Sequence, residues 1–323
     1  MRLQTVSSTR CFRRCPRAYF FCYIQGYRPM VDDEVRRFGS LFHAGREAWM
    51  LARKAGLFED EWLAAALKVI SREKADPFDV VRVEELMRGY HYRWCSEQFE
   101  VLEVEAEFRS PLVNPDTGAA SRTFTQAGKL DAIIRQGGRV MVDELKTSSE
   151  DVSTGSDYWK RLRLDGQVSA YFSGAAAIGH QVEGCMYDVV RKPSQRPFKA
   201  TLPESRKYTK DGKLYANMHG ADETPEEYRL RVREVIASEP ERYYSRSEVV
   251  RLDKELADYQ QDAWQTAVNI RESISRNVWP RNTGGCMMYG GTCDYWPICT
   301  GEKRDDEYRK LDWVHPELSE DTV

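Results

Sequence analysis

The middle of the chain carries two acidic residues and a lysine whose spacing suits phosphate chemistry. The segment GKLDAI contains Asp131, and the segment VDELK contains Glu144 and Lys146. Residues two apart on a β-strand point to the same face, so Glu144 and Lys146 share a face and Asp143 points to the other. If the two segments are neighbouring strands, Asp131 can meet Glu144. Two such carboxylates can bind hard divalent cations, and the ammonium group can position a water or stabilise charge on a phosphodiester.

A second set of chemically active side chains is a group of three cysteines near the C-terminus. The segment GGCMMYGGTCDYWPICTG places Cys286, Cys293 and Cys299 in a C-x6-C-x5-C array. Three thiolates are one ligand short of the four that bind structural zinc or a [4Fe-4S] cluster, so a fourth must come from elsewhere. Zinc sites usually have closely paired cysteines, which this array lacks, so zinc is the less favoured alternative. Unrelated thiols are the third alternative, and the apolar neighbours of Cys95 and Cys185 indicate buried thiols.

The elements that must position these residues differ along the chain. Residues 1–100 have helical periodicity, and residues 101–192 follow a βββαβ order. Residues 193–222 are rich in Pro, Lys and Gly without periodicity and are expected to form a loop or insertion. Residues 223–323 are expected to be helical and to end in the three-cysteine loop. The sequence therefore predicts an α/β fold in which helical regions flank a central sheet.

Composition limits the class of protein. The chain has 323 residues, of which 41% are hydrophobic and 31% charged, and no apolar run is long enough for a membrane span, so no membrane partner is expected. The first residues contain Arg and Cys where a signal peptide needs an apolar stretch, so we expect a cytoplasmic protein. In that compartment the eight cysteines are not expected to form a disulfide framework. A net charge of −3 gives no global nucleic-acid signature, although RCFRRCPR concentrates positive charge locally.

Four short motifs follow one another in an order that is specific when they are taken together. Gly39 precedes His43 by four residues, Asp131 ends a G-x-x-D motif, an E-x-K motif follows, and Gln167 precedes Tyr171 by four residues. Taken singly, these would be a packed helix histidine, a surface salt bridge and an ordinary helix face. Their joint order resembles the PD-(D/E)xK nuclease superfamily, and the first and last motifs resemble its RecB-like branch.

This resemblance implies a restriction-endonuclease-like core with a mixed β-sheet, and a Mg²⁺- or Mn²⁺-dependent deoxyribonuclease that is expected to be an exonuclease. The catalytic cation that it implies is Lys146, while Gln167 and Tyr171 would touch the substrate backbone or orient that lysine. The sequence departs from the pattern at Asp143, where an apolar residue is usual, and in residues 193–222, which have no counterpart in it. The metal ligands that the resemblance implies are His43, Asp131, Glu144 and the backbone carbonyl of Leu145.

The N-terminal segment resembles RecB-like nucleases that carry an iron–sulfur staple, such as the AddB nuclease domain and the CRISPR-associated RecB-like exonucleases. In these proteins one N-terminal cysteine joins three C-terminal ones around a [4Fe-4S] cluster and clamps the two ends of the nuclease domain together. The match of Cys15 and Pro16 to this pattern implies Cys15 as the fourth ligand. Cys11 is the first alternative, because it lies one helical turn away, and Cys22 is the second.

Further polar residues either belong to the site or simply face solvent. Glu47 lies one turn after His43 and is expected to face solvent or an outer shell of the site. Glu105 and Glu107 share one strand face and either add a metal ligand or face solvent. The N-terminal arginines can contact phosphates or form a solvated helix face. These arginines are Arg10, Arg13, Arg14 and Arg17.

Two further classes of function compete with the nuclease. One is a catalytically silent DNA-binding or scaffold subunit of a repair or recombination complex, and the other is a zinc-stapled RNA-processing protein. The expected substrate is DNA, single-stranded or with free ends. The chain has no G-x-x-x-x-G-K-[ST] motif for binding ATP, so unwinding would need a helicase or recombination partner. The motifs leave open whether the pathway is repair, recombination, phage replication or CRISPR spacer acquisition.

Overall fold

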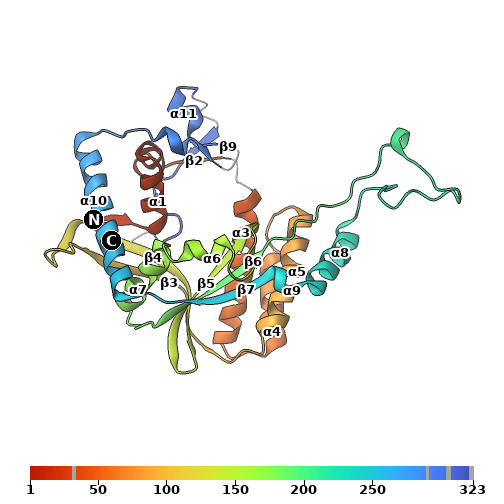
Figure 1. Cartoon of the computed structure of the whole chain (residues 1–323), viewed down its shortest axis with the longest axis horizontal. Helices are drawn as coiled ribbons and strands as arrows, with labels where there is room; N and C mark the ends of the chain where they lie inside the picture. Colours follow the sequence, from red (N-terminus) through yellow and green to blue (C-terminus); the bar gives the residue numbers. More distant parts are fainter. Residues whose placement is uncertain (31–33, 289–290, 303–306, 320–323) are drawn as a thin grey trace.

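The computed structural model describes residues 1–30, 34–288, 291–302 and 307–319 (Figure 1). The first elements are β1 (Arg2–Gln4), α1 (Val6–Arg14), α2 (Pro16–Tyr19), a π-helix (Phe20–Ile24), β2 (Tyr27–Pro29), α3 (Glu34–Lys54), α4 (Glu59–Ile70), α5 (Pro77–Trp94) and β3 (Glu100–Val113). The central elements are β4 (Ala120–Gln136), β5 (Arg139–Ser148), α6 (Asp157–Leu162), α7 (Gly166–Ala177) and β6 (Gly184–Arg191). The last elements are α8 (Pro225–Ser238), α9 (Pro240–Tyr243), β7 (Tyr244–Val249), α10 (Asp253–Arg276), β8 (Met287–Met288), β9 (Gly291–Thr292), α11 (Trp296–Thr300) and β10 (Tyr308–Lys310).

A mixed six-stranded sheet forms the centre of the fold. Its strand order is β1-β4-β5-β6-β7, and β3 pairs with β4 beside that path. The β1–β4 and β5–β6 pairs are parallel and the others are antiparallel. Gly137 and Gly138 join β4 to β5, and both have positive φ angles, 57° and 84°, which a two-residue hairpin turn requires. The predicted α/β fold with a mixed sheet and flanking helices is confirmed.

Alternate residues of the strands pack against helices on opposite faces of the sheet. Met141 and Leu145 belong to an apolar cluster with α3, α4 and α5, while Val142 belongs to a cluster with α7. Figure 1 shows α3, α4 and α5 on one side of the sheet and α7 on the other. The odd-numbered residues of β5 therefore face α3, and the even-numbered ones, Glu144 and Lys146 among them, face α7.

The structure contains short strands that the sequence did not indicate, and it leaves Cys95 more exposed than expected. Residues 1–100 contain β1, which pairs with β4, and β2, which pairs with β10 near the other end of the chain. Residues 223–323 contain β7, the edge strand beside β6. Cys185 is buried as expected, but Cys95 is only partly buried, because it follows the last turn of α5.

The segment between β6 and α8 extends away from the rest of the molecule (Figure 1). Apart from a 3₁₀ turn at Pro203–Ser205 and one bridge between Tyr208 and Leu214, it has no regular secondary structure. It contains residues 193–222, for which the sequence led us to expect a loop or insertion. Among the described residues, no helix has the length and apolar character needed to cross a membrane.

Candidate active site and cysteine cavity

Glu144 lies at the centre of the candidate active site. Its side chain is fully buried, and its Oε1 accepts hydrogen bonds from Lys146 Nζ and, at 3.0 Å, from Gln167 Nε2. The other oxygen, Oε2, is buried without a hydrogen-bond partner in the described part of the chain. Burial, together with the nearby Asp131 carboxylate, raises the pKa of Glu144 to about 8. An unpartnered buried carboxylate oxygen is costly unless a cation or donor compensates it.

Asp131 and His43 lie beside this glutamate. Asp131 Oδ2 accepts a hydrogen bond from the backbone nitrogen of Leu145 at 2.9 Å, which ties β4 to β5 at the site. His43 Nδ1 lies 3.7 Å from the same oxygen. Burial lowers the pKa of His43, so the neutral imidazole that binds metals is favoured. His43 and the Leu145 backbone nitrogen therefore both contact Asp131, while Glu144 precedes Leu145 in the chain and is near enough for Asp131 to affect its pKa.

The glycine of the G-x-x-x-H motif has a packing role. A Cβ atom on Gly39 would lie 3.3 Å from Thr147 Oγ1 of β5, which is tighter than an ordinary contact. Glycine at this position lets α3 approach β5 closely. His43, one turn further along α3, is thereby brought to Asp131.

Lys146 is the cation of the site. Burial lowers its pKa, but the carboxylates of Glu144 and Asp131 outweigh that effect and raise the pKa above the usual value for lysine. The lysine is therefore charged, and 30% of its side chain remains exposed to solvent. It can meet a ligand that approaches from outside while it contacts the buried carboxylate.

The Q-x-x-x-Y motif contacts Glu144. Gln167 Nε2 donates to Glu144 and to the Tyr171 hydroxyl, and Tyr171 also forms a hydrogen bond with Glu144. Asp165 caps α7 by accepting a hydrogen bond from the backbone nitrogen of Gln167 at 2.8 Å. Two residues one helical turn apart therefore hold the carboxylate in place. From the sequence, we expected Gln167 and Tyr171 to touch the substrate backbone or to orient Lys146.

Glu105 and Lys129 form a charged pair near the site, and the sequence contained a weak indication for Glu105 and none for Lys129. Glu105 has a φ angle of 50°, which is rare for a residue with a side chain and is typical of strained functional positions. It forms an ion pair with Lys129, and burial raises its pKa, with Asp131 adding to the rise. Glu47 is close enough to affect both Glu105 and Lys129. Glu107 lies elsewhere and accepts hydrogen bonds from Ser319.

The donor atoms fit a hard divalent cation, although the side chains are not gathered around one point. In the parts of the chain that the structure describes, no three His, Cys, Asp or Glu side chains are placed to hold one metal ion. The imidazole of His43, the carboxylate of Asp131 and the unpartnered Oε2 of Glu144 are nevertheless ligand types that Mg²⁺ and Mn²⁺ accept. The orphaned oxygen is the feature that a bound cation would satisfy.

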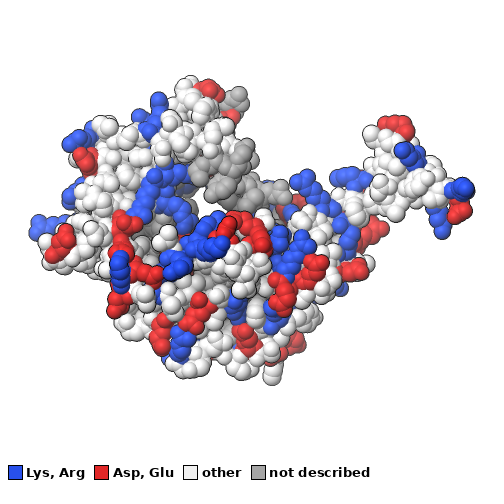
Figure 2. Space-filling model, in the orientation of Figure 1, with Lys and Arg blue, Asp and Glu red and all other residues white. Residues whose placement is uncertain are grey.

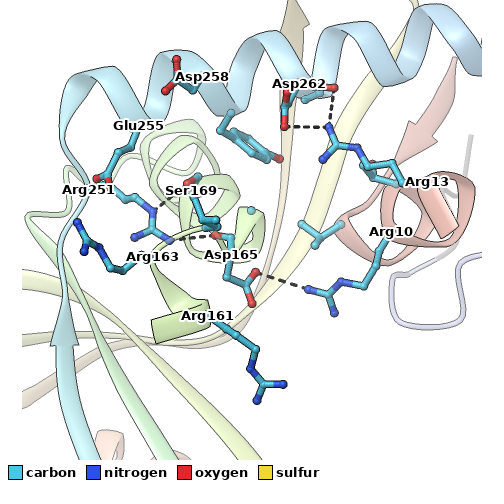
Figure 3. A pocket seen from close by; sticks show the side chains of 16 residues that line it. Arg10, Arg13, Arg161, Arg163, Asp165, Ser169, Arg251, Glu255, Asp258 and Asp262 are labelled. Carbon is cyan, nitrogen blue, oxygen red and sulfur yellow. Dashed lines mark hydrogen bonds and ion pairs between the residues drawn. The ribbon is translucent and has the colours of Figure 1, made fainter. Parts of the chain in front are cut away.

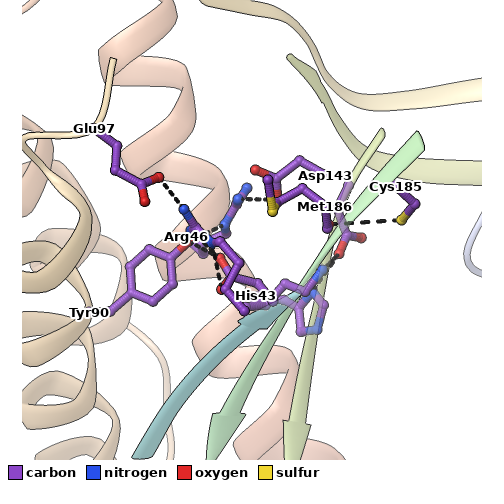
Figure 4. Close-up of polar contacts among 11 residues, drawn as sticks. His43, Arg46, Tyr90, Glu97, Asp143, Cys185 and Met186 are labelled. Atoms are coloured by element: carbon purple, nitrogen blue, oxygen red, sulfur yellow. Dashed lines mark hydrogen bonds and ion pairs between the residues drawn. The ribbon is translucent and has the colours of Figure 1, made fainter. Parts of the chain in front are cut away.

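Asp143 has a structural partner on the opposite face of β5. Its Oδ1 lies 2.5 Å from the guanidinium nitrogen of Arg46 on α3, and both side chains are almost completely buried. Figure 4 shows this pair beside Tyr90, whose hydroxyl also donates to Asp188 at 2.6 Å. The departure from the usual apolar residue before E-x-K is thus explained by an ion pair that joins α3, which carries His43, to β5, which carries Glu144.

A cavity of about 380 Å³ opens beside the first turn of α7 (Figure 3). Arginines from three elements line it, and Arg10 reaches across to Asp165 at 3.5 Å. Arg13 is held by Thr266 and Asp262 of α10, so its role is structural. The side chain of Arg163 lines the cavity and forms no ion pair or hydrogen bond with the described residues. The cavity therefore places free positive charge next to the helix that holds Glu144.

The four cysteines singled out by the sequence line a second cavity, of about 310 Å³: Cys15, Cys286, Cys293 and Cys299. The backbone nitrogen of Asn282 donates to Cys15 Sγ at 3.5 Å, and Arg17 and Arg281 also line the cavity.

The two alternative cysteines interact with each other. The Cys11 thiol donates to Cys22, which lowers the pKa of Cys22 to about 7 and raises that of Cys11. Neither is among the described residues that line the cysteine cavity. Cys15 thus lines the cavity, although Cys11 and Cys22 pack against the same apolar cluster.

Comparison with known proteins agrees with these motifs. A family model described as the PD-(D/E)XK nuclease superfamily matches residues 4–300. None of the curated proteins matches the chain. Among solved structures, the crystal structure of SSO0001 is similar at 17% sequence identity, over 74% of this chain and 78% of that chain, with a TM-score of 0.29, which is too low to support an argument. Since the family model covers nearly the whole sequence, the chain belongs to the PD-(D/E)XK nuclease superfamily.

Proposed function

We propose that this nuclease is a Mg²⁺- or Mn²⁺-dependent deoxyribonuclease of the RecB-like type that degrades DNA from an end. The observation that carries the proposal is the state of Glu144. One of its oxygens is held by Lys146 and Gln167, while the other is buried without a partner in the described residues. The Asp131 carboxylate is near Glu144 and contacts His43. A binding module has no use for a buried carboxylate that is oriented in this way but left uncompensated.

Each residue of the site has a role in this proposal. His43, Asp131, Glu144 and the Leu145 carbonyl would hold the metal, which when bound neutralises the phosphate and lowers the pKa of a water. Lys146 stabilises the charge that develops on the phosphate. Gln167 and Tyr171 keep the Glu144 carboxylate in one orientation, so no reorganisation is needed during the reaction.

The arginine cavity supports a single strand as the substrate. Arg163 offers positive charge to a phosphate backbone, and Arg10 and Arg161, now paired with Asp165 and Glu150, could turn to it. On its far side the cavity is lined by acidic residues of α10, including Asp258 and Asp262 (Figure 3). These would repel a second backbone, which favours one strand over a duplex.

Cleavage of end-labelled DNA tests the proposal. Linear single strands, linear duplexes and circular single strands would be incubated with the protein and Mg²⁺ or Mn²⁺. We expect linear single strands to be degraded from one end, circles to persist, and a chelator to stop the reaction. Rapid cleavage of circles would contradict the exonuclease, and metal-independent cleavage would contradict the proposed chemistry.

A catalytically silent DNA-binding subunit is the second candidate, and one observation favours it. Lys146 contacts Glu144 directly, and no three potential ligands are placed around a metal in the part of the chain that the structure describes. A bound metal must therefore separate or rearrange this pair. DNA binding without any metal-dependent cleavage, also in the presence of a helicase partner, would establish the silent subunit.

We further propose a [4Fe-4S] cluster in the cysteine cavity. All four thiols line one cavity, Cys15 from the N-terminal part of the chain and the other three from the C-terminal loop. A cluster there would join the two ends of the chain, which already pair through β2 and β10. Nearby Arg17 and Arg281 would offset the negative charge of a thiolate-ligated cluster. Zinc in the same thiolates remains the alternative.

Replacing single cysteines tests the choice of the fourth ligand. We expect anaerobically purified wild-type protein to contain about four iron atoms and four sulfides per chain. Cys15→Ser should lose most of this iron and its visible absorbance, because one of four ligands is removed. Cys11→Ser is the matched control, one helical turn away, and should keep both. Iron loss only in Cys11→Ser would reverse the assignment, and bound zinc in the wild type would contradict the cluster.

A further inference from the structure

The extended segment between β6 and α8 carries a charge opposite to that of the whole chain. Within residues 196–219, which we call the basic arm, there are six Lys or Arg and two Asp or Glu, giving a net charge of +4, whereas the whole chain has −3. Figure 2 shows basic side chains at the far end of the arm and again where it joins the body. A concentration of charge on a projecting segment indicates an interaction surface.

The two legs of the basic arm are held together by contacts of their own. The backbone nitrogen of Thr201 donates to the carbonyl of His219 at 2.8 Å, and the rings of Phe198 and His219 stack at 4.1 Å. At the root, Arg231 of α8 lies over the Phe198 ring, and Glu223 accepts a hydrogen bond from the Phe198 backbone. The arm is therefore a braced element with a fixed attachment to the body.

The far end of the basic arm presents positive charge that the protein does not neutralise. Lys207, Lys210 and Lys213 are exposed, and no carboxylate among the described residues forms an ion pair with any of them. Between them lie Tyr208 and Tyr215, with about half of each side chain exposed. Ammonium groups interleaved with exposed aromatic rings match the phosphates and bases of a nucleic acid.

A groove with several basic residues lies at the root of the arm. β6 pairs in parallel with β5, so Lys146 lies opposite Val189 and the arm leaves the sheet at the same edge. The groove at the root, of about 640 Å³, is lined by basic residues and two aspartates. Those basic residues are Arg37, Arg82, Arg196 and Lys199. Arg37 is on α3, the helix that brings His43 to the site.

We propose that the basic arm binds the phosphate backbone of the DNA that extends beyond the active site, so that the protein prefers long strands to short ones. This inference rests on the proposed function for its substrate class. The lysines supply sequence-independent affinity through counterion release, and the tyrosines supply stacking surfaces. The groove at the root continues the positive charge of the arm with Arg37 and Arg196.

Neutralising the arm tests the inference. The variant Lys207→Gln/Lys210→Gln/Lys213→Gln changes three exposed side chains and leaves the bracing contacts of the arm in place. The control Lys68→Gln/Arg72→Gln/Lys74→Gln removes the same charge from an exposed stretch at the end of α4. Affinity is measured in a Lys146→Ala background, which prevents degradation, for single strands of about 60 and about 10 nucleotides.

We expect the arm variant to lose about tenfold or more of the preference for the long strand, and the salt dependence of long-strand binding to weaken by about 2 in log–log slope. The control should match the parent in both measurements. An unchanged preference, or an equal loss in the control, would overturn the inference. The inference would also be overturned if the arm variant lost binding to anionic lipid vesicles but kept its binding to DNA.

Different results would contradict the proposed nuclease function and the inference about the basic arm. Wild-type protein that does not cleave the short strand with Mg²⁺ or Mn²⁺ would contradict the nuclease, whatever the arm does. Cleavage of the short strand combined with an unchanged preference in the arm variant would contradict only the arm. In a second arm variant, residues 202–218 are replaced by a short Gly-Ser turn. It should lose the preference for the long strand in the same way as the triple Lys→Gln variant.

Discussion

Replacing Lys146 with alanine is expected to reduce metal-dependent DNA cleavage by about 10²- to 10⁴-fold while DNA affinity changes little. The lysine is held charged by Glu144 and Asp131, and it lies at the solvent-facing edge of an otherwise buried site. It can therefore stabilise charge on a reacting phosphate, whereas most of the affinity for DNA comes from other basic residues. Single-turnover cleavage of labelled single strands, with binding measured in parallel, separates the two effects.

Lys160→Ala is the matched control for this prediction. Lys160 lies on α6 near the site, but its side chain is exposed and pairs with Asp157 at 2.8 Å. Its loss should leave the cleavage rate at the wild-type level. If Lys146→Ala cleaved as fast as the control, Lys146 would have no role in the reaction. If Lys146→Ala lost binding and cleavage equally, the lysine would serve in substrate binding.

The position of the carboxylates and the lysine could be predicted because it depends on local rules. Strand alternation places Glu144 and Lys146 on one face, and the two glycines between β4 and β5 fix the register that brings Asp131 to Leu145. These relations extend over fewer than twenty residues of sequence. The same locality made the mixed sheet with its flanking helices predictable.

The partners of the motif residues could not be predicted, because they depend on long-range packing. The target of Gln167 and Tyr171 is set by how α7 lies on the sheet. The backbone of Glu105 has a positive φ angle that no sequence pattern indicated. Arg46 was not singled out at all, since its partner is 97 residues away and the helical pattern gave it no special place.

The choice between Cys11 and Cys15 shows the same limit. The two cysteines are four residues apart, about one helical turn, so helical periodicity places them on similar faces. In the structure Cys15 ends α1 with an extended backbone, at φ −162° and ψ 113°, because Pro16 follows it. Cys15 lines the cysteine cavity, whereas Cys11 forms a hydrogen bond with Cys22. The proline that supported the family resemblance also explains the geometry.

Replacing Arg46 with methionine is expected to lower the free energy of unfolding by about 3–5 kcal/mol. Arg46 and Asp143 are both almost completely buried, and a second buried carboxylate, Asp188, lies close by. Without Arg46, the cation left near both carboxylates in the described part of the chain is Arg246, which already binds Asp188 through two nitrogens. An uncompensated charge in the core is costly, whereas an intact buried pair contributes little by itself. Urea unfolding followed by circular dichroism measures the change.

Two companion variants separate the buried charge from lost packing. Arg139→Met breaks an exposed pair with Glu248 and should leave the stability near that of the wild type. The double variant Arg46→Met/Asp143→Leu removes both charges and should recover a large part of the loss, because apolar side chains can replace a buried ion pair. If the double variant were as unstable as Arg46→Met, the packing of the arginine side chain would be responsible. In that case the acid before E-x-K would not owe its place to the ion pair that joins the His43 helix to the Glu144 strand.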